Sequence, residues 1–208
     1  MNKAKITGIL LAGGESRRFG SHKAFAKLHH KYFYEYAIEA LEGNVDELLI
    51  VSHPALEGQF RNQTTVEVLL DVPEYKGNGP LAGIFTAMQK QSSDWYVILP
   101  CDTPLVSDEL VKQLITFTKE EGIDAVVPII NNRQQPLIAV YHSRVVKKIE
   151  QLLNEKNLKM SLLLDRCNVK FVKNHDLRRH ESEFENINNQ TEYEKIQQKP
   201  MTDISNQD

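Results

Sequence analysis

Short apolar runs alternate with amphipathic stretches along most of this chain, and this alternation limits the possible fold more than any other feature. The apolar runs are typical of strands that are covered on both faces. They lie at residues 6–12, 48–51, 66–70, 95–99, 125–130 and 137–142. The stretches between them have apolar residues at helical spacing, at residues 34–41, 82–89, 109–117 and 144–153. Strands that alternate with helices predict βαβ units, and therefore an α/β fold with a mainly parallel, twisted sheet and helices on both faces.

A length of 208 residues suits a single domain, and the sequence contains no internal repeat and no Pro/Gly-rich linker that would divide it. We expect residues 1–197 to form this domain, with Ser107 as the cap of one of its helices. Residues 173–185 are polar and charged, and predict a loop or irregular structure. Residues 198–208 lack apolar periodicity and predict a disordered tail.

The charge and the cysteine content exclude several classes of protein. A formal net charge of -3 gives the chain no general attraction for nucleic acid or for an acidic membrane. No apolar run approaches the roughly 20 residues of a membrane span, and the first run is too short for a signal sequence with a cleavage site. Cys101 and Cys167 form neither a CxxC pair nor a disulfide framework, which favours a reducing compartment. We therefore expect a cytoplasmic protein that binds neither nucleic acid nor membranes.

A pair of glycines and a cluster of cations follow the first predicted strand. Gly13 and Gly14 lie where this strand ends, which is the edge at which open α/β sheets bind ligands. Glycines at such a position allow consecutive backbone N–H groups to approach an anion. Arg17, Arg18 and Lys23 add three positive charges nearby. The combination predicts a polyphosphate site rather than a plain turn with solvated basic residues, although neither GxxxxGKS/T nor GxGxxG fits the glycine spacing.

This loop resembles the LAGG-x-S-x-R-x-G-x-x-K signature of a nucleotidyltransferase family that includes sugar-phosphate, isoprenoid-precursor and molybdenum cofactor transferases. The matching residues are Leu11, Ala12, Gly13, Gly14, Ser16, Arg18, Gly20 and Lys23. The resemblance implies a Rossmann-like nucleotidyltransferase fold, in which the backbone of residues 11–14 holds a nucleoside triphosphate and Lys23 neutralises its charge. Many members have an acidic residue just before the lysine. This chain has His22 there, so a role for that acid is not carried over.

Asp102 lies just after the predicted strand at residues 95–99. An ionised carboxylate at the end of a buried strand needs a partner. Mg²⁺ takes one or two carboxylates together with phosphate oxygens, so one aspartate beside a triphosphate is chemically sufficient. The alternative is a carboxylate that only caps the turn into Pro104. With the first loop so near in the predicted fold, we favour a metal ligand.

Asp71 and the glycine-rich run at residues 77–83 form the third signal. Pro80 suits the first turn of a helix, and Gly79 and Gly83 leave little side chain to obstruct a flat base. In the resembled family this run packs beside the nucleobase, and the aspartate contacts the nucleotide. The carboxylate suits the N–H donors of guanine as well as ribose hydroxyls, and both remain open. A helix cap and loop without any ligand is the other interpretation.

Asn186 and Asn188 form the weakest signal, because asparagines in loops are most often turn residues. The segment is similar to the Asn-x-Asn that ends the catalytic region in the same family and precedes a short helix. The resemblance implies that both side chains face the metal or the acceptor phosphate.

The run Pro100-Cys101-Asp102-Thr103-Pro104 is similar to the molybdenum cofactor guanylyltransferase branch in particular. That resemblance implies GTP and molybdopterin as substrates, Mg²⁺ as cofactor, and other proteins of molybdenum cofactor biosynthesis as partners. It also implies that the terminal phosphate of molybdopterin attacks the α-phosphorus of GTP and expels pyrophosphate. Lys23, Arg18 and Mg²⁺ on Asp102 would relieve the repulsion between the two anions. A phosphate monoester has a second pKa of about 6 and needs no general base.

Two kinds of alternative remain open. Within the family, the chain could act on sugar phosphates or isoprenoid precursors, or transfer a cytidylyl group to the molybdenum cofactor; nucleotide preference separates these. From a different class, it could be a non-catalytic module that binds nucleotide without releasing pyrophosphate. The presence of both Lys23 and Asp102 argues against such a module.

Overall fold

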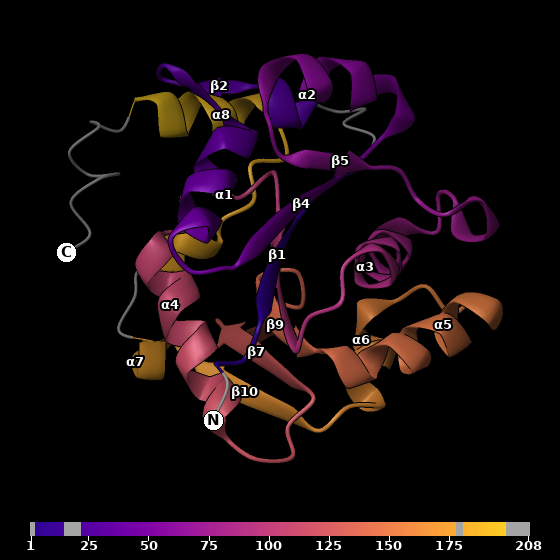
Figure 1. Ribbon diagram of the computed structural model, residues 1–208. Coiled ribbons are helices and arrows are strands. Elements are labelled where there is room, and N and C mark those ends of the chain that lie inside the picture. The colour runs from indigo at the N-terminus through magenta and orange to yellow at the C-terminus, as the bar shows by residue number, and fades with distance from the viewer. Residues whose placement is uncertain (1–2, 15–21, 178–180, 199–208) are drawn as a thin grey trace.

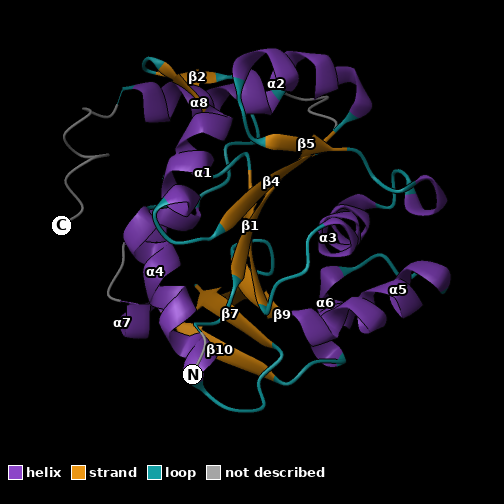
Figure 2. Ribbon diagram, in the orientation of Figure 1, coloured by secondary structure: helices purple, strands orange, loops and turns teal. Residues whose placement is uncertain are grey.

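A twisted sheet of eight strands forms the centre of the computed structural model, which describes residues 3–14, 22–177 and 181–198 (Figures 1 and 2). Seven strands follow one another in the order β10-β7-β9-β6-β1-β4-β5, and β8 (Arg133–Gln134) pairs with β7. The seven are β1 (Ile6–Ala12), β4 (Glu47–Ser52), β5 (Glu67–Leu69), β6 (Trp95–Pro100), β7 (Ala125–Ile130), β9 (Ala139–His142) and β10 (Val169–Lys173). A separate hairpin consists of β2 (Lys27–Leu28) and β3 (Lys31–Tyr32).

Four strand pairings are parallel (β1–β4, β1–β6, β4–β5 and β7–β10) and three are antiparallel (β6–β9, β7–β9 and β7–β8). The prediction of a mainly parallel sheet is confirmed. The antiparallel part begins at a hairpin in which Asn131 and Asn132, with φ angles of 51° and 60°, turn the chain from β7 into β8. Asparagine is one of the few non-glycine residues that adopt this left-handed conformation readily.

Helices cover both faces of the sheet, as predicted (Figure 1). In β1, Ile9 and Leu10 point to opposite faces and are both fully buried. Leu10 belongs to the core under α1 and α4, and Ile9 belongs to the core under α3, α5 and α6, which explains why the first apolar run is continuous. The helices are α1 (Phe33–Glu42), α2 (Glu57–Gln63), α3 (Gly79–Lys90), α4 (Asp108–Thr116), α5 (Val146–Asn154), α6 (Met160–Asp165), α7 (Asn174–Leu177) and α8 (Gln190–Gln197). No helix within the described ranges is long and apolar enough to cross a membrane.

The prediction of a loop over residues 173–185 is wrong in part, because α7 and a 3-10 turn at Glu181–Phe184 lie within it. The 3-10 turn is held by Glu183, which is fully buried. Its Oε2 accepts hydrogen bonds from the hydroxyl of Ser107 at 2.6 Å and from the Ser107 N–H at 3.2 Å. Ser107 also caps α4 as predicted, since its Oγ accepts from Leu110 N at 3.1 Å. Polar contacts of this kind order a segment without leaving an apolar pattern in its sequence. Residues 199–208 lie outside the described ranges, so the disordered tail stays a prediction.

Carboxylates fix the amino edge of the sheet, which is the edge opposite the predicted ligand site. Asp46, Asp94 and Asp124 each directly precede a strand. Their Oδ2 atoms accept backbone N–H groups at the start of a neighbouring strand, from Ile6 at 2.9 Å, Lys5 at 2.7 Å and Asn168 at 2.9 Å respectively. These bonds hold the strands in register at the end that does not bind ligand.

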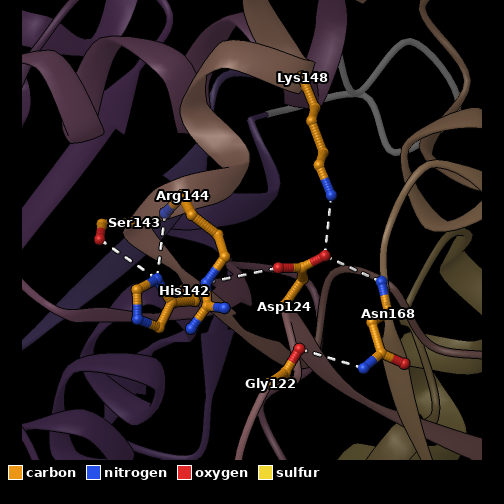
Figure 3. Close-up of polar contacts among 7 residues, drawn as sticks. All are labelled: Gly122, Asp124, His142, Ser143, Arg144, Lys148 and Asn168. Atoms are coloured by element: carbon orange, nitrogen blue, oxygen red, sulfur yellow. Dashed lines mark hydrogen bonds and ion pairs between the residues drawn. The ribbon is translucent and has the colours of Figure 1, made fainter.

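Asp124 has the densest set of partners among these carboxylates (Figure 3). Only 8% of its side chain is exposed, and it contacts Lys148 Nζ at 2.8 Å and Arg144 Nε at 3.4 Å. Burial by itself would raise the pKa of Asp124, but the hydrogen bonds from Lys148 and Asn168 and the positive charges nearby outweigh it and lower this pKa. Beside it, burial and then the charge of Arg144 lower the pKa of His142, whose Nδ1 accepts from the Arg144 N–H at 3.1 Å.

Asp124→Asn should lower the free energy of unfolding at pH 7 by about 1–3 kcal/mol, because a buried site loses the charge that pairs with two cations. A carboxylate with a lowered pKa stabilises the fold while it is ionised. The difference between wild type and variant should therefore be present above about pH 4, the unfolded-state value, and disappear as the pH falls through the lower folded-state pKa. Urea unfolding between pH 7 and pH 2 measures it. Asp165→Asn, at an exposed position on α6, is the matched control, and equal losses in the two variants would contradict the assignment.

Candidate active site

The carboxyl ends of β1, β4, β5 and β6 border one cavity of about 650 Å³. Parallel strands end at the same edge of a sheet, so residues that are distant in sequence meet there. Gly13 follows β1, His53 follows β4, Asp71 follows β5 and Asp102 follows β6. The predicted site residues that line this cavity are Leu11, Ala12, Gly13, Gly14, Lys23, Asp71, Asp102 and Asn186.

Lys23, Asp102 and Asn188 form the polar centre of the site. Lys23 Nζ donates to Asp102 Oδ2 at 3.0 Å and to Asn188 Oδ1 at 2.6 Å. Only 14% of the Lys23 side chain and 22% of the Asp102 side chain are exposed, so their charges interact more strongly than in open solvent. The structure thus brings together three predicted residues from distant parts of the chain. Arg18 lies outside the described ranges, and its role stays a prediction.

Gly13 and Gly14 leave open space beside this polar centre. Among the described residues, a Cβ atom on Gly13 would meet nothing beyond its chain neighbours closer than 4.0 Å, and one on Gly14 would meet nothing within 4 Å. Packing against these residues therefore does not require glycine here, whereas close approach of a ligand to the backbone would. Gly83 differs, because a Cβ atom there would lie 3.1 Å from Leu11 Cδ2 and 3.3 Å from Val51 Cγ1. Gly83 was predicted to leave space for a base, and it also allows α3 to pack closely on the sheet.

Asp71 shapes the loop that leads into α3. Its Oδ2 accepts from Gly77 N at 3.0 Å, and Gly77 has a φ of 75°, so the loop turns back on itself. Pro80 lies in the first turn of α3, as predicted. Within the same loop, the Tyr75 hydroxyl donates to Asn154 Oδ1 at 2.8 Å and connects the loop to α5. Within the described residues no hydrogen bond occupies Asp71 Oδ1, which leaves an acceptor for a ligand.

Cys101 lines the cavity, and its thiol is a weak nucleophile. Burial, followed by the charge of Asp102, raises the pKa of the Cys101 thiol to about 12, so the thiol is protonated at neutral pH. Its backbone N–H donates to Leu11 O at 3.0 Å and extends the pairing of β1 with β6. The residue contributes packing rather than a nucleophile.

The C-terminal segment (residues 181–197) contacts both sides of the polar centre. The N–H of Ile187 donates to the carbonyl oxygen of Asp102 at 2.8 Å. Further along, the Tyr193 hydroxyl donates to the carbonyl oxygen of Lys27. The segment therefore connects the turn after β6 with the β2–β3 hairpin that follows the glycine loop.

Among the cavity residues that were not predicted from sequence, two groups are informative. His22 and His53, whose ring centroids are 6.1 Å apart, lie beside the glycine loop. His53 directly follows β4, so the position of ligands at strand ends could have identified it. The other group is residues 135–138 together with Met160. Residues 135–138 precede the antiparallel strand β9, and no rule about parallel strands places them in the site.

A family model described as the MobA-like NTP transferase domain matches residues 8–170 of this chain. The chain belongs to this family. It is therefore a nucleotidyltransferase of the MobA-like type, and the prediction that it is an enzyme of this class is confirmed. The matched residues include the glycine loop, Asp71 and Asp102, and the match ends before the C-terminal segment.

Relatives of the MobA-like family support the same assignment over nearly the full length. A protein of Bacillus mycoides (strain KBAB4) named "Probable molybdenum cofactor guanylyltransferase" is 43% identical over 204 residues, which cover 98% of this chain and 100% of the relative. A protein of Geobacillus sp. (strain WCH70) with the same name is 42% identical over 192 residues, which cover 92% and 98% of the two chains.

The fold also matches a solved structure. Molybdopterin-guanine dinucleotide biosynthesis protein A from Archaeoglobus fulgidus superimposes with a TM-score of 0.80 at 23% sequence identity, over 92% of this chain and 96% of the other. At this level of identity the match establishes a shared fold, and confirms the predicted nucleotidyltransferase architecture.

Proposed function

We propose that this MobA-like chain transfers GMP from GTP to the terminal phosphate of molybdopterin and releases pyrophosphate. The observation that supports this most directly is the contact of Lys23 with Asp102 and Asn188 beside an open glycine loop. A cation, a carboxylate and the backbone of the glycine loop thus lie together in a cavity that is also lined by Asp71. The names of the full-length relatives add guanine as the base and the molybdenum cofactor as the acceptor.

Mg²⁺ fits the oxygen atoms at this point. Asp102 Oδ2 and Asn188 Oδ1 both contact Lys23 Nζ, so two oxygen donors already converge on one positive charge. Among the residues that the structure describes, no three His, Cys, Asp or Glu side chains cluster as a complete metal site. Phosphate oxygens and water therefore have to complete the shell, which is the usual arrangement for Mg²⁺. Asp102 and Asn188 would hold the ion, with Asn186 nearby, and the ion would supply charge neutralisation between the reacting phosphates.

The protein residues act by position and charge. Backbone N–H groups of residues 13 and 14 bind phosphate oxygens, and Lys23 stabilises the negative charge that grows as the acceptor phosphate approaches the α-phosphorus. Arg18 adds a second cation in this proposal. The acceptor phosphate is largely dianionic at neutral pH, since its second pKa is about 6, so no side chain has to remove a proton. Asp71 Oδ1 accepts from the guanine N–H donors or from the ribose.

We also propose that the enzyme is cytoplasmic and acts together with other proteins. Neither Cys101 nor Cys167 forms a disulfide, which suits the reducing cytoplasm. Other proteins of molybdenum cofactor biosynthesis are the proposed partners, because molybdopterin has to be delivered and its guanylylated product passed on.

GTP with Mg²⁺ should raise the melting temperature by about 5–10 °C at a concentration of about 100 Kd, whereas CTP, ATP and UTP should have much smaller effects. Pyrophosphate release should then require GTP, Mg²⁺ and molybdopterin together. A preference for CTP would indicate the cytidylyl alternative. Tight GTP binding without pyrophosphate release in the complete mixture would indicate a binding module and refute the enzyme activity.

A further inference from the structure

The cavity extends past the polar centre, on the side away from Asp71. Across the carboxyl edge of the sheet, Asp71 lies by β5, the glycine loop by β1, Asp102 by β6, and Ile138 just before β9. Neighbouring strands are about 4.8 Å apart, so β5 and β9 each lie roughly 10 Å from β1, in opposite directions. In-line displacement places the attacking oxygen of the acceptor opposite the leaving pyrophosphate. With the nucleoside at Asp71 and the phosphates at the glycine loop, the end of the cavity towards β9 is left for the body of the acceptor.

The segment before β9 lines that end with Gln135, Pro136, Leu137 and Ile138, and Met160 at the start of α6 also lines the cavity; we call these five residues the acceptor wall. All five side chains are uncharged, and four of them are apolar. This composition distinguishes it from the polar centre, where a phosphate would bind.

The backbone of the acceptor wall is fixed by its own hydrogen bonds. The Gln135 N–H donates to Pro128 O at 2.9 Å, and the Ile138 N–H donates to Gln135 O at 3.2 Å. The Tyr141 hydroxyl donates to Pro136 O at 2.7 Å. In contrast, the side-chain amide of Gln135 makes no hydrogen bond with any described residue, although the residue lines the cavity. One amide group on an ordered apolar wall is therefore available to a ligand.

We propose that the acceptor wall binds the ring end of the acceptor as a flat, uncharged heterocycle, with the Gln135 amide hydrogen-bonded to the edge of the ring. A sugar or polyol phosphate would need several hydroxyl partners, because each unpaired hydroxyl that is removed from water costs free energy. The wall has one polar group. A pterin has apolar faces and an edge of N–H donors and a carbonyl acceptor, which one amide can pair with on both its oxygen and its nitrogen. This inference rests on the proposed function and specifies where its acceptor binds.

Gln135→Ala should raise the KM for molybdopterin about 10- to 100-fold, the effect of two lost hydrogen bonds, and leave kcat and the KM for GTP unchanged. Leu137→Asp should raise the KM for molybdopterin further, because it places a charge against an uncharged ring. Gln134→Ala is the matched control, since Gln134 is the exposed neighbour on β8 and lies outside the cavity. Pyrophosphate release with Mg²⁺-GTP and molybdopterin measures all three.

Calorimetric titration of each protein with molybdopterin, in the absence of nucleotide, gives a second measurement that does not need turnover. Unchanged molybdopterin affinity in both wall variants would overturn the assignment, as would an equal rise in the KM for GTP. If the wild type releases no pyrophosphate, the proposed function fails. The titration still tests in that case whether the acceptor wall binds molybdopterin. Weaker binding in Gln135→Ala but not in Gln134→Ala supports this proposal, and equal or absent binding rejects it.

Discussion

Replacing Lys23 by alanine should lower the turnover number by on the order of 10²-fold or more, the usual effect of removing one preorganised electrostatic group. Lys23 contacts both Asp102 and Asn188, and 14% of its side chain is exposed, so water replaces its charge poorly. The loss should appear in kcat more than in the KM for GTP, because the charge that Lys23 stabilises grows as the two phosphates approach.

Steady-state pyrophosphate release, with thermal unfolding as a check on folding, measures the effect of Lys23→Ala. Lys27→Ala is a matched control, because this exposed lysine lies four residues further on and does not line the cavity. Undiminished turnover in Lys23→Ala would refute the role of Lys23, and a comparable loss in Lys27→Ala would point to a general disturbance of the loop.

Asp102→Ala should abolish Mg²⁺-dependent transfer, a loss on the order of 10³-fold or more, because the ion would lose its only carboxylate ligand in the proposed site. Folding should be retained. The bond to the C-terminal segment uses the carbonyl oxygen of Asp102, which every substitution keeps.

Asp102→Asn separates charge from shape, since the amide keeps one oxygen in place. Its residual activity should need a higher Mg²⁺ concentration than the wild type, and a Mg²⁺ titration of both variants tests this. Wild-type activity at wild-type Mg²⁺ concentration in either variant would place the metal elsewhere.

The sequence predicted most of the sheet because strands that are buried on both faces give continuous apolar runs. The run at residues 6–12 coincides with β1, since Ile9 and Leu10 are fully buried on opposite faces. The run at residues 137–142 correctly indicated β9, but its antiparallel direction depends on the turn at Asn131 and Asn132. Apolar periodicity does not report strand direction.

Candidate site residues were easiest to predict where they follow parallel strands, although His53 after β4 was missed. Strand ends identified Asp71 and Asp102 from elementary rules. Asn188 came only from the family resemblance, because 165 residues separate it from Lys23, its partner. Gln135 gave no signal, since its loop reaches the cavity through an antiparallel hairpin. The buried Glu183 was overlooked because its partner, Ser107, is fixed by tertiary structure rather than by local sequence.

The contacts of the C-terminal segment have a consequence for the synthesis of the protein. Domains form from the N-terminus while the ribosome adds about 5–20 residues per second. The sheet and the core under α3, α5 and α6 need only residues up to β10. Leu177 and Phe184 complete the other core, and Asn188 and Ile187 contact Lys23 and Asp102 from still further along the chain. A nascent chain can therefore form its sheet before the proposed catalytic centre is complete, and we expect activity only after the last helix has emerged and docked.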